Sequence, residues 1–243
     1  SESAITFEMA MAVLYAGFAG ACLALLVYNI ALWRAMRERF LLAYCVMLVA
    51  TLAYGIFTSG APHYFIAGMS GSDRLAFTTP LLAYAASTAL IFMRYFFENA
   101  NVPRWLIRAT FAHAAWMSGF ATLYAVMAPG YVKQLDLIYV YSFVPVSVIF
   151  GAYVFTAWKH RDPFLAYFLV AWSGPLVSAA FRMLHALDLL PYHILIENST
   201  LLGLTFESVV SSLAIGHRVR LLAQARNRAE IADAHAMSMA DTD

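Results

Sequence analysis

The amino-acid sequence predicts an all-α membrane protein built as a bundle of seven membrane-spanning helices. Of the 243 residues, 63% are hydrophobic and only 12% are charged, whereas water-soluble chains carry about a quarter charged residues. A spanning helix needs ~20 mostly apolar residues. Seven stretches of the chain meet that need, at roughly 5–33, 40–59, 75–97, 104–127, 136–158, 164–187 and 194–217. Because these spans and their loops use nearly the whole length, we assign residues 1–217 to one membrane domain.

The connections between these stretches are marked by charged or turn-forming residues. The first connection is short and basic, and the second, residues 60–74, is the longest and is rich in glycine. Pro129-Gly130 separates the fourth and fifth stretches, Asp162-Pro163 separates the fifth and sixth, and Pro191 follows the sixth. Proline and glycine are the strongest local markers of turns, so each of these places is expected to be a loop.

The distribution of Lys and Arg predicts the orientation of the bundle. Arg74 and Lys133 lie in loops on one side, and Arg182 lies near the end of the sixth span. All the other basic residues fall on the opposite side: Arg34, Arg37, Arg39, Arg94, Arg104, Arg108, Lys159, Arg161, Arg218, Arg220, Arg226 and Arg228. The side rich in positive charge is cytoplasmic. We therefore expect the N-terminus outside and residues 218–243 in the cytoplasm, as a truncated linker helix.

Five ionisable residues at the outer end of the last two spans form the most distinctive polar cluster. Arg182, His185 and Asp188 are spaced three apart and share one helical face. His193 and Glu197 open the next span and point back to the same layer. Ionisable groups within spans are costly and usually functional, so this cluster is a candidate site for a small polar or anionic ligand. The alternative is that Arg182 pairs with Asp188 or Glu197 and only holds the two helices together.

Other polar residues lie deeper in the spans and suggest contacts between helices. The Tyr28-Asn29 pair lies in the first span, and an amide there is expected to bond across to another helix. Glu207 lies deep in the last span and needs a partner, such as a hydroxyl or Asn29, so we assign it to coupling. His113 is interpreted as a satisfied core residue. Cys22 and Cys45 are interpreted as small apolar packing residues.

The tail, residues 218–243, contains an apolar seam with coiled-coil spacing. The seam residues recur at intervals of three and four: Leu222, Ala225, Ala229, Ala232, Ala236 and Met239. Such a seam predicts pairing with a second copy of the same helix. Because alanine buries little area, at ~25 cal/mol per Å², the pair should be weak. The alternative is a solvated helix that frays on its own.

Several of these residues together resemble a known family, the bacterial seven-transmembrane receptors with diverse intracellular signalling modules. The resemblance covers roughly residues 10–225. At the N-terminal end it rests on Gly17, Gly20, Tyr28, Asn29, Arg37, Arg39, Leu41, Tyr44 and Gly60. At the C-terminal end it rests on Glu207, Ser211, Ser212, Leu213, Ala214 and Arg218. Glu38 and Phe40 depart conservatively from the usual aspartate and tyrosine.

The resemblance implies a sensor in the bacterial inner membrane whose output module lies beyond the tail. The start at Ser1 without Met, and the Asp241-Thr242-Asp243 end, lead us to expect a piece of a longer protein. That end is similar to the opening of a GGDEF-type diguanylate cyclase, with a histidine kinase as the alternative output. We expect no catalytic residue, metal site or cofactor in the chain itself. The expected partners are membrane lipid, a small ligand and a second copy, but no nucleic acid.

A different class of function remains as an alternative to the receptor. A membrane-embedded metal-dependent hydrolase or a small-molecule transporter would use the same polar cluster of the last two spans. For the hydrolase, His113, His185 and His193 would have to converge on zinc, and their spacing does not require this.

Overall fold

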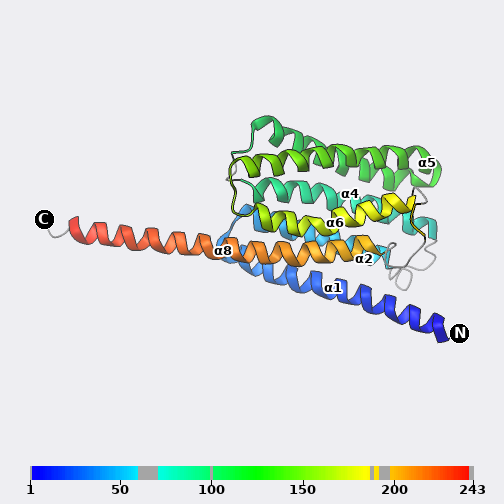
Figure 1. Cartoon of the computed structure of the whole chain (residues 1–243), viewed down its shortest axis with the longest axis horizontal. Helices are drawn as coiled ribbons and strands as arrows, with labels where there is room; N and C mark the ends of the chain where they lie inside the picture. The colour runs from blue at the N-terminus through cyan, green and yellow to red at the C-terminus, as the bar shows by residue number, and fades with distance from the viewer. Residues whose placement is uncertain (1, 60–70, 99–100, 187–188, 192–197, 241–243) are drawn as a thin grey trace.

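The computed structural model is helical throughout the part of the chain that it describes, residues 2–59, 71–98, 101–186, 189–191 and 198–240. The helices are α1 (Glu2–Met36), α2 (Arg39–Thr58), α4 (Gly71–Phe96), α5 (Arg104–Lys159), α6 (Leu165–Ala186) and α8 (Ser199–Ala240). They run side by side along the long axis of the molecule (Figure 1). The all-α prediction is thereby confirmed for these residues.

Among the described residues, five helical segments are long and apolar enough to cross a membrane. These segments are Met9–Met36, Arg39–Thr58, Ala76–Phe96, Ile138–Lys159 and Ser199–Ala229. A further apolar helix, Leu165–Phe181, is shorter. The chain is therefore a multi-pass membrane protein, while the count of seven spans and their orientation stay predictions.

The element α5 runs from Arg104 to Lys159, and the chain reverses within it near Pro129-Gly130, where a turn was expected. The Nε2 atom of His113 lies 2.9 Å from the carbonyl oxygen of Ser142, 29 residues further on. A straight helix would separate these residues by ~44 Å, at 1.5 Å per residue. Thus α5 is a helical hairpin with two antiparallel arms, close to the two spans predicted for this region.

The connections on the tail side are tight and end in recognisable caps. After α5, Arg161 adopts the left-handed conformation with φ 50°, and the N–H of Asp162 donates to the carbonyl of Ala157 at 2.9 Å. This pattern is a Schellman-type helix end. The carboxylate of Asp162 then accepts from the N–H of Phe164 at 2.8 Å and starts the turn into α6. Between α1 and α2, Arg37 takes a similar left-handed conformation with φ 57°.

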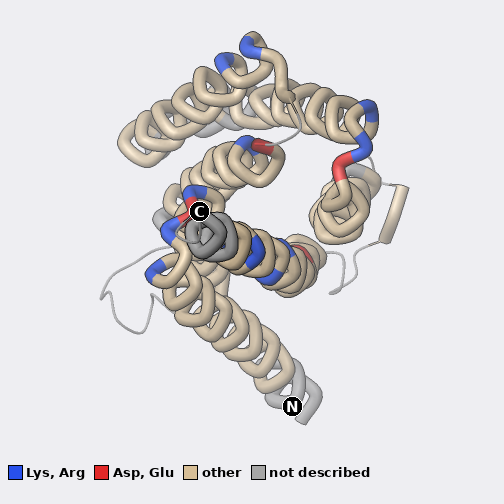
Figure 2. The backbone as a smooth tube through the Cα atoms, turned by 90° about the vertical axis from the view of Figure 1, so that its left-hand side faces the viewer, with Lys and Arg blue, Asp and Glu red and all other residues tan. Residues whose placement is uncertain are grey.

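The packing order of the helices puts α8 at the junction of the bundle. Helix α4 packs between α2 and α5, whereas α8 contacts α1, α2 and α6. Viewed from the end where α8 leaves the bundle, α1 lies on one side of α8 and α5 forms the far layer on the other (Figure 2). Any movement of α8 would therefore change its contacts with three neighbouring helices.

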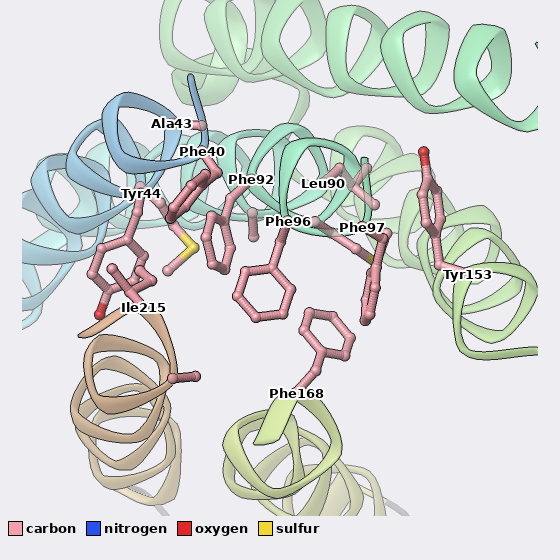
Figure 3. Close-up of a cluster of buried hydrophobic side chains, with 14 of the residues drawn as sticks. Phe40, Ala43, Tyr44, Leu90, Phe92, Phe96, Phe97, Tyr153, Phe168 and Ile215 are labelled. Carbon is pink, nitrogen blue, oxygen red and sulfur yellow. The ribbon is translucent and has the colours of Figure 1, made fainter. Parts of the chain in front are cut away.

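A cluster of buried aromatic rings fills the centre between α2, α4, α6 and α8 (Figure 3). Phe168 of α6 lies edge-on to Phe97, directly after α4, with ring centroids 4.7 Å apart, and the ring of Tyr44 of α2 lies 5.1 Å from that of Phe92 of α4. Ile215 of α8 closes the cluster from the other side and is fully buried. Aromatic pairs at these distances add to the burial of their area, so this cluster is the stable core of the bundle.

Candidate functional site

The structure leaves the predicted outer cluster untested. Arg182 and His185 lie in the last two turns of α6, but their side chains fall outside the described part of the chain. Asp188, His193 and Glu197 also lie outside the described residues. The ligand site built from these five residues stays a prediction.

The N-terminal end of α8 is fastened to two helices. The hydroxyl of Tyr15 in α1 donates to the side-chain oxygen of Asn198 at 3.2 Å. The hydroxyl of Ser178 in α6 donates to the carbonyl of Ser199 at 2.6 Å. A movement of α1 or α6 at this end would therefore act on α8 directly.

Helices α6 and α8 approach closely one turn further in, where two glycines face each other. A Cβ atom at Gly203 would lie 2.8 Å from the carbonyl oxygen of Gly174, and it would overlap the hydroxyl of Ser178. A Cβ at Gly174 would in turn lie 2.9 Å from the carbonyl oxygen of Gly203. Small residues allow helix backbones to meet in membranes, and here they place α6 against the same helix that carries Glu207.

A layer of buried polar side chains joins α8 to α1 about halfway along the bundle. The side-chain amide of Asn29 is completely buried and donates to the hydroxyl of Ser212 at 3.1 Å. It also donates to the carbonyl of Leu25 at 2.8 Å, which fixes the orientation of the amide. The bond expected from Asn29 to another helix is present, and α8 supplies its partner. Its neighbour Tyr28 is 48% exposed, and its hydroxyl lies beside Gly216 of α8.

Glu207 lies in the same layer and is bonded by hydroxyl groups of its own helix. Its carboxyl group, on a residue only 3% exposed, accepts from Ser211 at 2.7 Å and from Ser208 at 3.5 Å. The hydroxyl of Tyr44 in α2 donates to the carbonyl of Ser208. In the described residues Glu207 has no ion pair. We call Asn29, Tyr44, Glu207, Ser208, Ser211 and Ser212 the polar layer.

At the other end of the bundle, Arg218 of α8 is buried in a cage of aromatic rings. Its guanidinium carbon lies 4.3 Å from the ring centroid of Phe40, 5.5 Å from that of Phe96 and 5.6 Å from that of Phe164. Its Nη1 donates to the backbone carbonyl of Phe96, at the end of α4. A cation over desolvated rings gains about 2 kcal/mol or more. This aromatic cage joins α8 to α2, α4 and the start of α6.

The part of the chain that contains the polar layer and the aromatic cage matches a family model. The model, described as 7TM diverse intracellular signalling, matches residues 11–218, from the N-terminal part of α1 to Arg218. The chain belongs to this family. No curated protein and no solved structure matches the chain.

Membership of the 7TM diverse intracellular signalling family confirms the resemblance read from the sequence and makes the chain a membrane receptor domain for intracellular signalling. The match ends at the aromatic cage, where α8 leaves the bundle. From there α8 continues to Ala240 without a break (Figure 1). Leu222 packs against the core, whereas Ala225, Ala229 and Ala232 are exposed.

One ion pair ties the tail of this receptor domain back to the bundle. The guanidinium of Arg226 lies 2.7 Å from the carboxylate of Glu38, which precedes α2. Both side chains are partly exposed, at 53% and 29%, so the pair contributes up to about 1 kcal/mol. The ion pair holds one face of the tail, the face that carries Arg226, towards α2.

The sequence had singled out three members of these contacts: Asn29 and Glu207 as polar groups within spans, and Arg218 as part of the family resemblance. It did not select Tyr44, Ser208, Phe40, Phe96 or Phe164 as site residues. The serines were visible as a polar run beside Glu207. The aromatic rings carried no signal, because they come from three separate helices and resemble any other core residue.

Proposed function

We propose that residues 1–217 sense a signal at the outer side of a bacterial inner membrane and that α8 carries it to a cytoplasmic output enzyme. The observation that carries this proposal is the continuity of α8. One 42-residue helix includes the polar layer, the aromatic cage and the free tail. It is about 63 Å long at 1.5 Å per residue, far longer than a ~30 Å bilayer core.

In the proposed arrangement seven spans cross the membrane, with the N-terminus outside. The family match and the concentration of basic residues near Arg218 support this orientation. The ligand is a small polar or anionic molecule bound by Arg182, His185, Asp188, His193 and Glu197. In the sequence these residues lie between Ser178 and Gly203, which hold α6 and α8 together. A ligand there changes the packing of α6 on α8 and so moves the tail.

The output that we propose is a diguanylate cyclase acting as a dimer, with a histidine kinase as the alternative. The support is the coiled-coil spacing of Leu222, Ala225, Ala229 and Ala232, together with the family's link to intracellular signalling. A paired helix can set the distance or the rotation of two catalytic domains. In this reading residues 218–243 are a linker and contain no catalytic group.

A fusion of residues 1–243 to a diguanylate cyclase domain tests this proposal. One alanine inserted after Leu222 turns everything beyond it by about 100°, whereas a seven-residue insertion nearly restores the facing. We expect the single insertion to change cyclic di-GMP output several-fold and the heptad insertion to change it little. Arg182→Ala and Glu197→Ala should alter the response without lowering the amount of protein in the membrane.

The control is Arg220→Ala, an exposed position on the same helix. If output ignored the single insertion and the substitutions alike, α8 would be a passive anchor and the receptor reading would be wrong. Stoichiometric zinc or hydrolase activity in the purified chain would favour the enzyme alternative.

A further inference from the structure

The apolar seam of the tail is a direct continuation of the face of α8 that is buried in the bundle. Stepping back from Leu222 by four, three, four and three residues reaches Arg218, Ile215, Ser211 and Ser208. All four of these residues are buried, and Leu222 itself packs against the core. The same three-four rhythm therefore runs from the polar layer to the tail on one side of a single helix.

The opposite face of α8 is exposed along its whole length in the bundle. Leu213 is 67% exposed, and Leu202, Phe206 and Val209 precede it on the same stripe. In the tail this outward face continues through Arg220, Gln224 and Asn227, all of which are exposed. Residues two apart are about 200° apart around a helix, so Asn227 and Ala229 face nearly opposite ways.

The helix does not twist far enough to bring the seam around to the outside. A straight α-helix drifts only ~20° per heptad from a 3.5-residue repeat. Over the two heptads from Leu222 to Ala236 this drift is ~40°. The seam therefore stays on the side of its own bundle, where Arg226 is held by Glu38.

Because the seam lies on the bundle side of α8, two straight copies of this helix cannot pair directly through it. A parallel coiled coil would place the partner helix ~8–10 Å from the seam. Extended back into the membrane, that partner helix would pass through space occupied by Phe40, Phe96 and Phe168 of the core. Turning the whole of α8 instead would expose Glu207 and Arg218 to lipid, where charged groups are strongly unfavourable.

We propose that the bundle blocks the approach of a partner helix, although Ala225, Ala229 and Ala232 are exposed in the single chain. Two copies then pair through Leu222 and these alanines only after the tail has moved away from its own α2. The partner is a second copy of this tail. The movement begins beyond Arg218, because the aromatic cage holds the part of α8 above it, and the Arg226–Glu38 ion pair opposes it. This inference rests on the proposed dimeric signalling function and specifies which contact regulates the dimer.

Disulfide cross-linking of the full chain in membrane vesicles tests this inference. Ala229→Cys reports pairing through the seam, and Asn227→Cys reports contact through the opposite face. In the background of Glu38→Arg, which repels Arg226, we expect the rate of cross-linking at position 229 to rise about two- to fivefold, in line with the strength of an exposed ion pair. The double exchange Glu38→Arg with Arg226→Glu should restore the original rate, and position 227 should respond to neither change.

Two results would overturn the inference. One is fast cross-linking at position 229 that ignores Glu38→Arg, because the seam would then be available in the resting state. The other is a rise at position 227 instead of position 229. Either result leaves the proposed function standing as long as the cyclase fusion still responds to the single alanine insertion. If the fusion ignores that insertion, the proposed function fails regardless of the cross-links.

Discussion

At the scale of single residues, the bond between Asn29 and Ser212 is the direct polar link between α1 and the buried face of α8. Interhelical hydrogen bonds in membrane proteins contribute about 0.6 to 2 kcal/mol. We expect Asn29→Ala to lower the free energy of unfolding in detergent by about 1 kcal/mol, measured by thermal or denaturant unfolding. The matched control is Tyr28→Phe next to it, a half-exposed residue that should show no change. Equal losses from both substitutions would contradict the role given to Asn29.

Arg218 depends on the shape of its side chain as well as its charge. The planar guanidinium stacks over Phe40 and donates to the carbonyl of Phe96, which a lysine ammonium cannot do in the same geometry. Arg218→Lys should therefore lose part of the stability, and Arg218→Ala should lose about 2 kcal/mol or more. Arg220→Ala, two residues further and exposed, is the control. Full retention of stability in Arg218→Lys would show that charge alone is sufficient.

The residue scale also shows the limit of sequence reasoning. Glu207 and Asn29 could be found because polar groups within an apolar stretch must have partners. The surroundings of Arg218 could not, since an arginine at the end of a span normally extends to water. Here the ends of three helices enclose it instead, and only the packing of α2, α4 and α6 reveals this.

At the scale of helices, the close approach of α6 and α8 requires glycine at position 203. Gly203→Ala introduces a Cβ only 2.8 Å from the carbonyl oxygen of Gly174. Forced overpacking of this kind costs about 1–3 kcal/mol, so we expect lower thermal stability and altered output in the cyclase fusion. Gly119→Ala in α5 meets nothing within 4 Å and should be neutral or slightly stabilising. Similar behaviour of the two variants would argue against a tight α6–α8 contact.

The helices themselves were largely predictable, because length and apolarity determine where a chain can span a membrane. In α5 the sequence also indicated the place of the reversal, near Pro129-Gly130, and ring contacts such as that of Tyr124 with Tyr139 close the hairpin. Local turn signals do not show how two long arms pack on each other.

At the scale of the whole molecule, charge asymmetry predicts which end of the bundle faces the cytoplasm. A single cysteine in place of Ala232 should react with a membrane-impermeant maleimide only after the cells are opened. A cysteine in place of Tyr64, in the connection predicted to lie outside, should react in intact cells. The unmodified chain is the control, since Cys22 and Cys45 are buried. Labelling in the reverse pattern would invert the orientation and place the tail outside.

The unbroken α8 makes the molecule a lever with its pivot at the aromatic cage. From Arg218 to Ala240 the helix measures ~33 Å, at 1.5 Å per residue. A tilt of about 5° at the cage displaces the tip of that arm by ~3 Å, comparable to the helix shifts that switch known allosteric proteins. On the other side of the pivot Gly203 lies ~22 Å from Arg218, so the same tilt corresponds to a shift of ~2 Å at the contact of α6 with α8. The long arm makes a small rearrangement inside the membrane mechanically significant outside it.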